Sequence, residues 1–248
     1  MIRIAVLNIK GGSGKSTLAT NLAAWLAQCG RRVAMVDYDP QESAMNWLGR
    51  RPAELPRING VSAKGSDIRL TRVYRLVEGL DPEFTIMDTP AAISAQNLIY
   101  FCRDAHKVLV PVLPSRIDID VGARMIRNLY VHGGIKKGDD RLGIIASRVR
   151  RDTLAYKNLQ RFLAVLEIPV IADIRDSQNY VRCAESGMGV TELQPYQRAA
   201  DIGAWESILH WIEPPITLNT ESVTKESARQ HDPSRIARLV SLLPERDP

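Results

Sequence analysis

The stretch "NIKGGSGKST", residues 8–17, decides the fold of this chain of 248 residues. It has three glycines within the four positions before Lys15. Residues 2–8, "IRIAVLN", form an apolar run typical of a buried strand, and residues 15–30, "KSTLATNLAAWLAQCG", carry the apolar spacing of a helix. A glycine-rich loop between such a strand and such a helix binds phosphate groups, because its N–H groups converge on phosphate oxygens and the helix N-terminus attracts anions. The stretch therefore predicts a site for the phosphates of a nucleotide.

Each residue of this loop is expected to make a different contact with ATP or Mg²⁺. The ammonium of Lys15 is expected to reach the β- and γ-phosphates, the Ser16 hydroxyl to coordinate Mg²⁺, and Thr17 to contact the α-phosphate. The other positions expected to bind the nucleotide are Gly11, Gly12, Ser13 and Gly14. The alternative is a glycine-rich turn that only happens to precede a helix.

Beyond the loop, short apolar runs alternate with segments of helix length. Further strands are expected at 32–37, 84–88, 107–113, 142–148 and 168–174. Helices are expected at 67–79, 94–104, 117–131, 153–166, 177–186 and 197–212. Continuously apolar strands separated by helices predict an α/β fold with a doubly wound, mostly parallel sheet and helices on both faces. Ligands of such sheets bind outside the carboxyl ends of the strands.

Carboxylates follow two further strands of the predicted sheet. The segment "VDYDPQES", residues 36–43, supplies Asp37 and Asp39, and the strand "FTIMD", residues 84–88, ends in Asp88. Two carboxylates spaced by one residue at a strand end can point toward one phosphate site, although Asp-x-Asp-Pro is also a common turn with a helix cap. Asp88 has the position of a carboxylate that supports the metal ion, and its alternative role is to cap a turn.

Lys10 does not belong to the minimal phosphate loop, since it precedes the glycines and cannot easily fold back onto phosphates bound by its own subunit. A solvated lysine beside a turn is one explanation. The other is that the pattern Lys-Gly-Gly-x-Gly-Lys-Ser-Thr over 10–17 resembles the deviant Walker A signature of the ParA/MinD family of P-loop ATPases. The resemblance covers about residues 1–212. Its other two motifs are Asp37, Asp39, Pro40 and Gln41, and then Asp88, Thr89 and Pro90.

This resemblance implies roles for the charged residues of the predicted site. Lys10 would cross a dimer interface and contact phosphates bound by the partner subunit, so that ATP joins two subunits face to face. Asp39 would orient the attacking water, while Asp37 and Asp88 would support Mg²⁺ through water. No residue looks like a strong general base, so slow ATP hydrolysis is expected, with Lys10, Lys15 and Asp39 as the catalytic residues. The residues expected by family position in the adenine pocket are Arg148, Pro169 and Arg175.

The charge of the chain is compatible with a polyanionic partner, since its net charge is +5. The resemblance to ParA implies that the ATP-bound dimer binds double-stranded DNA without sequence specificity, through the C-terminal half. The residues expected to contact DNA phosphates are Arg148, Arg150, Arg151, Lys157, Arg161 and Arg182. A second basic stretch, 50–75, is the alternative surface, and any single arginine can simply be solvated.

The resemblance also implies a partner and a place in the cell. The phosphate loop starts at Lys10, as in short ParA-like ATPases, which position plasmids or protein cargoes such as carboxysomes. In these systems a small adaptor protein on the cargo stimulates hydrolysis, and the expected localisation is cytoplasmic and nucleoid-associated. Three widely spaced cysteines indicate reduced thiols and disfavour the metal-cluster ATPases of the same fold.

Residues 217–248 differ in character from the predicted ATPase domain, 1–216. The segment 217–235 is polar and has no apolar period, which predicts a flexible tail, and 236–243, "IARLVSLL", is a short amphipathic segment. A MinD-like membrane contact through this segment is the alternative to DNA binding. The segment is short and lacks Trp and Phe, so membrane binding is not expected.

Overall fold

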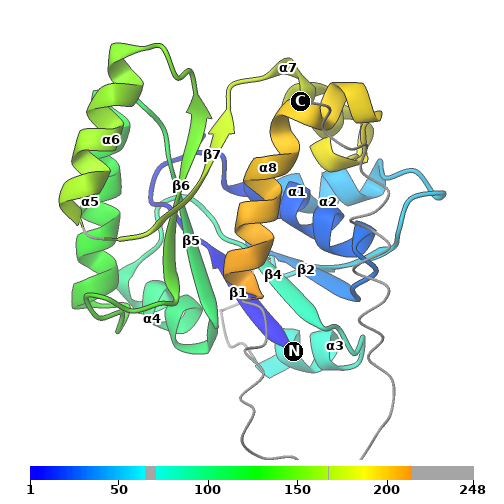
Figure 1. Ribbon diagram of the computed structural model, residues 1–248. Coiled ribbons are helices and arrows are strands. Elements are labelled where there is room, and N and C mark those ends of the chain that lie inside the picture. Colours follow the sequence, from blue (N-terminus) through cyan, green and yellow to red (C-terminus); the bar gives the residue numbers. More distant parts are fainter. Residues whose placement is uncertain (65–70, 167, 214–248) are drawn as a thin grey trace, which may run out of the picture. The chain divides into compact units, whose positions relative to one another are not determined.

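Seven parallel strands form one sheet in the part of the chain that the computed structural model describes, residues 1–64, 71–166 and 168–213 (Figure 1). In chain order the strands are β1 (Ile2–Val6), β2 (Val33–Asp37), β3 (Ile58–Ser62), β4 (Phe84–Asp88), β5 (Lys107–Val112), β6 (Leu142–Val149) and β7 (Val170–Arg175). Their order across the sheet is β3-β2-β4-β1-β5-β6-β7. The predicted α/β fold is therefore confirmed. The predicted tail, 217–248, lies outside the described residues.

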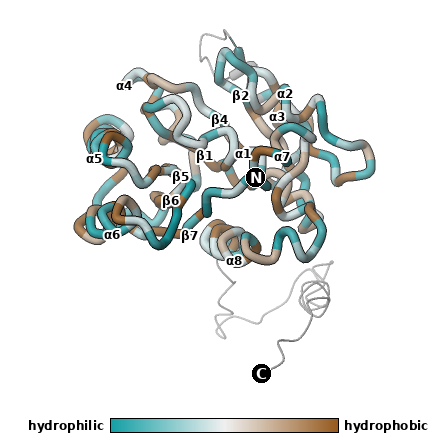
Figure 2. Tube along the Cα trace, turned by 90° about the horizontal axis from the view of Figure 1, so that it is seen from above, coloured by the Kyte–Doolittle hydropathy of each residue, from teal (hydrophilic) through white to brown (hydrophobic). Residues whose placement is uncertain are grey.

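Helices cover both faces of this sheet. One layer contains α1 (Lys15–Gln28), α2 (Ser43–Gly49), α7 (Gln178–Ser186), the 3₁₀ helix η1 (Val190–Glu192) and α8 (Pro195–Ile212). The other layer contains α3 (Thr71–Glu78), α4 (Ala95–Asp104), α5 (Arg116–Val131) and α6 (Leu154–Leu166). Figure 2 shows strands β5, β6 and β7 between α8 on one side and α5 and α6 on the other. No helix in these described ranges is long and apolar enough to cross a membrane.

The strands are buried because each face of the sheet packs against an apolar helix face. All residues of β2 and β4 are buried, and so are the last five of β5. On one face the strands contact side chains such as Leu22 of α1 and Trp205 of α8, and on the other Phe101 of α4 and Met125 of α5. Burial on two faces explains why these strands read as continuous apolar runs in the sequence.

Two short elements, α2 and β3, were not predicted from the sequence. The seven residues of α2 are too few to display an apolar period, and β3 contains Asn59 and Gly60, which are poor strand formers. Their packing also depends on tertiary contact, because a Cβ atom at Gly60 would lie 2.6 Å from Cδ1 of Leu48 on α2. The ends of the predicted elements differ from the observed ones by at most two residues, apart from 67–70, which lie outside the described residues.

The sheet brings the loops of the predicted site to one edge. The register pairs Asp88 at the end of β4 with Val6 of β1 on one side and with Asp37 of β2 on the other. Because the strands are parallel, the segments that follow β1, β2 and β4 leave the sheet together. The phosphate loop also contacts the segment after β4 directly, since Ala92 N donates to Ile9 O at 3.1 Å.

Candidate nucleotide site

The phosphate loop after β1 has the backbone shape that its glycines predict. Gly12 and Gly14 have φ angles of +73° and +93°, a region that side chains with a Cβ rarely adopt. Gly14 is the N-cap of α1, and its carbonyl accepts the hydrogen bond from Leu18 N at 2.8 Å. Ser13 is buried between these glycines, and its hydroxyl has no hydrogen-bond partner in the described part of the chain. The N-terminus of α1 therefore opens onto a loop that a phosphate group can approach closely.

Lys15 lies inside this loop rather than on the protein surface. Only 6% of the residue is exposed, and its ammonium donates to the carbonyl of Lys10 at 3.2 Å. Burial lowers the pKa of Lys15, while the carboxylates of Asp88 and Asp39 act in the opposite direction. A buried ammonium with one carbonyl partner has donors left for phosphate oxygens.

Asp88 is the most strongly perturbed carboxylate of the site. It is fully buried, and within the described ranges neither carboxylate oxygen has a hydrogen bond of good geometry. Burial raises the pKa of Asp88 to about 7, while the nearby Ser16 hydroxyl opposes this rise and the Asp37 carboxylate adds to it. A buried carboxylate without partners, beside a hydroxyl at the end of a phosphate loop, fits a hydrated Mg²⁺ ion.

Asp37 is occupied by backbone amides. Its Oδ2 accepts hydrogen bonds from Ala44 N at 2.9 Å and Met45 N at 3.1 Å, and its Oδ1 accepts from Asp39 N at 3.0 Å. Burial raises the pKa of Asp37, and these amide bonds counteract the rise. The helix-cap alternative considered for this segment is therefore observed, because Asp37 fixes the start of α2. Asp39 is half-exposed, and its Oδ1 accepts from Gln41 N at 2.9 Å.

The ammonium of Lys10 forms an ion pair with a carboxylate of its own chain. Its ammonium lies 2.6 Å from Oδ1 of Asp118, in the first turn of α5. Its backbone N–H donates to Oδ1 of Asn8 at 3.0 Å, and the amide of Asn8 in turn donates to Pro111 O at 2.7 Å. Asn8 and Asp118 were not predicted as site residues. Asn8 lies within the quoted loop stretch, but nothing in the sequence connects Asp118 with Lys10, 108 positions earlier.

Of the three residues predicted to line an adenine pocket, Arg148 and Arg175 lie at the carboxyl ends of the neighbouring strands β6 and β7, where Val149 pairs with Arg175. Arg148 is exposed near the end of β6 with a φ angle of +51°, and its neighbour Ser147 lies beside Gly14. Arg175 donates two hydrogen bonds to the buried carboxylate of Asp201, at 2.8 and 2.7 Å.

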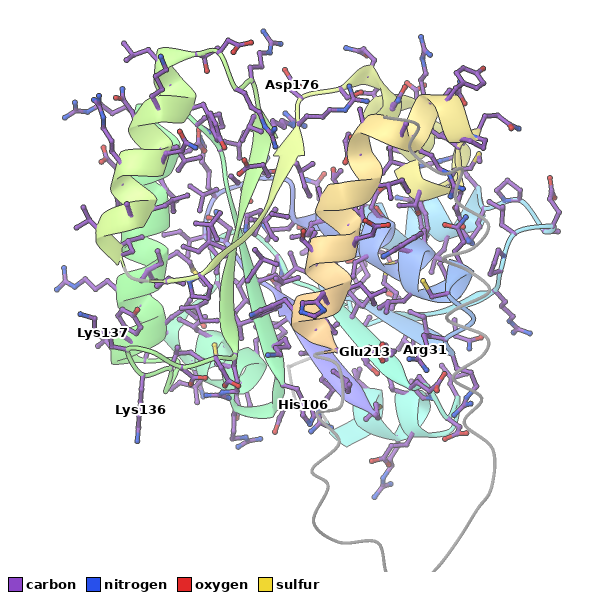
Figure 3. The ribbon with its side chains drawn as sticks, in the orientation of Figure 1. Arg31, His106, Lys136, Lys137, Asp176 and Glu213 are labelled. Carbon is purple, nitrogen blue, oxygen red and sulfur yellow. The ribbon has the colours of Figure 1, made fainter. Side chains whose placement is uncertain are left out.

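Pro169 lies at the opposite edge of the sheet from the phosphate loop. It precedes β7, and its carbonyl accepts from Ile144 N at 2.9 Å. In Figure 3, Asp176 marks the carboxyl edge, after β7, and His106 marks the amino edge, where β5 begins. Because the strands are parallel and six residues of β7 span roughly 20 Å, the fold does not bring Pro169 to the nucleotide site. We therefore withdraw Pro169 as an adenine contact.

The cations predicted to bind DNA form two groups, all with exposed side chains. The first group begins where β6 runs into α6, with Arg148, Arg150 and Arg151, and continues along α6 with Lys157 and Arg161. Two of them face carboxylates: Arg150 pairs with Asp176 at 2.5 Å, and Arg151 lies 3.9 Å from Asp173. Arg182 is separate from this group, because it lies on α7, which packs beside α2.

An open pocket of about 290 Å³ lies between the start of α5, next to Lys10, and the start of α6. Its lining residues are Leu113, Pro114, Ser115, Asp118, Arg148, Arg150, Thr153 and Ala155. The pocket therefore joins the carboxylate that holds Lys10 to the first two cations of the basic group.

Comparison with known proteins identifies the family. Residues 4–190 match the family described as the CobQ/CobB/MinD/ParA nucleotide binding domain. The chain belongs to this family. It is 32% identical over 195 residues to Maintenance of carboxysome distribution protein A from Gloeobacter kilaueensis, an alignment that covers 76% of this chain and 83% of the relative.

Solved structures of the family share the fold. MinD cell division protein from Aquifex aeolicus superposes with a TM-score of 0.66 at 19% identity, covering 84% of this chain and 97% of that chain. A Cyanothece McdA–ATP complex gives a TM-score of 0.62 at 18% identity, covering 84% and 96%. The predicted membership of the ParA/MinD family is confirmed, and with it a nucleotide-binding domain.

Proposed function

We propose that this chain is an ATPase of the ParA/MinD type, which dimerises around ATP and then binds double-stranded DNA without sequence specificity. Slow hydrolysis, stimulated by a small adaptor protein on a cargo, releases the DNA. The similarity to a carboxysome distribution protein favours a protein cargo over a plasmid.

One observation carries the nucleotide-binding part of this proposal: Lys15 and Asp88 are buried beside the glycine-rich loop, and both have unused bonding capacity. Burying two such groups without full partners costs free energy in the isolated protein. A bound triphosphate with Mg²⁺ supplies partners to both, because the ammonium binds phosphate oxygens and the carboxylate binds water on the metal.

The residues of the chain then have distinct tasks in hydrolysis. Lys15 and the loop amides hold the phosphates, and the Ser16 hydroxyl holds the metal ion. When bound, Mg²⁺ neutralises the negative charge on the phosphate oxygens. Asp39, which is half-exposed, orients the attacking water, and Asp37 keeps that segment in place through its hydrogen bonds to the first turn of α2. Lys10 contributes its charge to the nucleotide of the other subunit.

The DNA surface of the proposed dimer is the exposed basic group at the start of α6, formed by Arg148, Arg150, Arg151, Lys157 and Arg161. Neutralising phosphates with lysine and arginine gives binding that depends on salt and not on sequence. Arg182 on α7 contributes a separate contact.

A DNA-retention assay with ATP, with ADP and without nucleotide tests this function. We expect retention with ATP only. Asp39→Ala should remain on DNA in the presence of ATP, because it forms the dimer but no longer orients the attacking water. Lys15→Ala, which loses the nucleotide, is the matched negative control.

Three results would contradict the proposal or a part of it. If the protein is retained on DNA equally with ATP, with ADP and without nucleotide, DNA binding does not depend on the nucleotide site. Co-sedimentation with anionic lipid vesicles in ATP, without DNA retention, would favour the MinD-like membrane alternative instead. Normal ATP turnover in Asp39→Ala would remove the role given to Asp39.

A further inference from the structure

The side chain of Lys10 is held by a carboxylate of its own chain. The ammonium lies 2.6 Å from Oδ1 of Asp118, and the two side chains are 38% and 10% exposed. The backbone N–H of Lys10 is fixed at the same time by Asn8, which is itself anchored to the end of β5 through Pro111. Lys10 is therefore bound at both ends to groups around the end of β5 and the start of α5.

The carboxylate of Asp118 has stabilising contacts that do not depend on Lys10. Ser115, the N-cap of α5, donates its hydroxyl hydrogen bond to Oδ2 of Asp118 and accepts one from Asp118 N at 3.2 Å. The N-terminus of α5 also favours a negative charge in its first turn. In addition, Arg148 and Arg150 line the same pocket as Asp118. The charge of Asp118 is thus supported when Lys10 leaves.

These contacts create a competition for one ammonium group. The proposed dimer requires Lys10 on phosphates of the other subunit, whereas the single chain holds the same ammonium on Asp118. The single ammonium group of Lys10 cannot contact Asp118 and the phosphates of the other subunit at the same time.

We propose that Asp118 is the positioning residue of Lys10: it holds the lysine within its own subunit, and ATP-dependent pairing of two subunits must break this ion pair. The inference deepens the proposed function and rests on it for the second step. It makes Asp118 a determinant of how much protein is needed for the ATP-bound dimer to form.

The ion pair itself is tested without nucleotide, so this test does not depend on the proposed function. The nucleotide-free protein is acetylated with a water-soluble acetyl ester, and the labelling rate of each lysine is followed by peptide mass spectrometry. Asp118→Asn should label Lys10 about threefold faster than the unsubstituted protein, because it removes the charge that holds the ammonium. Asp120→Asn, an exposed neighbour on the same helix, is the matched control and should leave the rate unchanged. An unchanged rate in Asp118→Asn would overturn the proposal.

The release step is tested by dimerisation. Sedimentation velocity in ATP measures the protein concentration at which half of the chains are paired, and thermal unfolding verifies that each variant is folded. Asp118→Asn should lower this concentration by about threefold, and Asp120→Asn should not change it. A higher or unchanged concentration in Asp118→Asn would overturn the proposal, because Asp118 would then not oppose pairing.

The two experiments distinguish the two ideas. If the unsubstituted protein stays monomeric in ATP while Asp118→Asn still accelerates labelling of Lys10, the ion pair exists and the proposed dimer does not. If the unsubstituted protein dimerises while both Asp118→Asn measurements match the control, the proposed function stands and the positioning role of Asp118 is wrong.

Discussion

Lys15 and Asp88 illustrate how burial acts on two neighbouring groups of opposite charge. Removal from water lowers the pKa of the lysine and raises the pKa of the aspartate, so burial disfavours both charged forms in the nucleotide-free protein. Neither group has a complete set of partners among the residues that the structure describes. The site is therefore held in a costly state that nucleotide and metal ion can relieve.

The raised pKa of Asp88 predicts a pH-dependent stability. The folded, nucleotide-free protein binds a proton at Asp88 more tightly than the unfolded chain does between about pH 4 and pH 7, so its free energy of unfolding falls as the pH rises through this window. Asp88→Asn removes this dependence. We expect it to stabilise the metal-free protein by roughly 2–4 kcal/mol at pH 8 and by much less at pH 5, measured by urea unfolding. An equal effect at both pH values would show that Asp88 does not titrate in this range.

The two lysines of the loop predict different effects. Lys15→Ala should abolish ATP binding, because it removes the ammonium that lies inside the loop. Lys10→Ala should leave ATP binding measurable, since its side chain points to Asp118, while ATP-dependent dimerisation and DNA retention disappear. Calorimetry measures nucleotide binding, and sedimentation measures the dimer. An equal fall of ATP affinity in both variants would contradict separate roles.

At the scale of elements, α2 connects the nucleotide site to α7 and η1. Its start is fixed by Asp37, and near its end Trp47 Nε1 donates to Met188 O at 3.1 Å. The next residue after the helix and its cap, Arg51, forms a buried ion pair with Glu192 of η1, with N–O distances of 2.5 and 3.0 Å. Gly187 permits this approach, because a Cβ atom there would lie 2.4 Å from Arg51 N. The segment after β2 is thus held at both ends.

This buried pair predicts a large stability effect far from the phosphate loop. The side chains of Arg51 and Glu192 are 6% and 1% exposed, so Glu192→Gln leaves a guanidinium buried without its counter-charge. We expect the free energy of unfolding to fall by about 3 kcal/mol, measured in urea. Arg103→Ala, which breaks a contact of an arginine that is 62% exposed, should change it by less than about 1 kcal/mol. Similar destabilisation in the two variants would show that burial does not set the cost.

At the scale of the whole described unit, the parallel sheet gives its two edges different roles. The carboxyl edge collects the phosphate loop, the carboxylates after β2 and β4, and the basic group at the start of α6. Within that basic group, Arg150 and Arg151 lie near the carboxylates of Asp176 and Asp173, which offset part of their charge. The group continues along α6 with Lys157 and Arg161. The candidate nucleotide site and the proposed DNA surface therefore lie at the same edge of the sheet, where Asp118, Arg148 and Arg150 line one pocket.

The basic group predicts the salt dependence of DNA binding. Replacing both Arg151 and Lys157 by alanine should weaken ATP-dependent DNA binding for every sequence tested. It should also reduce the slope of log affinity against log salt by about 0.9 for each DNA phosphate that the variant no longer neutralises. Lys136→Ala, an exposed lysine at the amino edge, is the control and should leave the slope unchanged (Figure 3). An unchanged slope in the double variant would move the DNA surface to the 50–75 stretch.

The sequence by itself determined the features that depend on neighbouring residues. The phosphate loop, the strand before it and the helix after it lie within the first 28 residues, so apolar periodicity and glycine spacing were enough to predict them. Continuous apolar runs likewise predicted the doubly wound sheet, because only strands buried on both faces can be apolar at every position. The same runs are the reason why Asp37, Asp39 and Asp88 were predicted as site residues, since each lies at the end of such a strand or within two residues of it.

Only the tertiary structure decided which distant residues meet. The contact of Lys10 with Asp118 joins positions 108 residues apart, the cap that Asp37 provides became visible with α2, and Arg175 is engaged by Asp201. Pro169 was misplaced because a residue near the end of a helix and the start of a strand lies at the amino edge, whereas ligands bind at the carboxyl edge. Local pattern specifies an element, but partners across a sheet follow from strand order and crossover direction, which no short stretch of sequence contains.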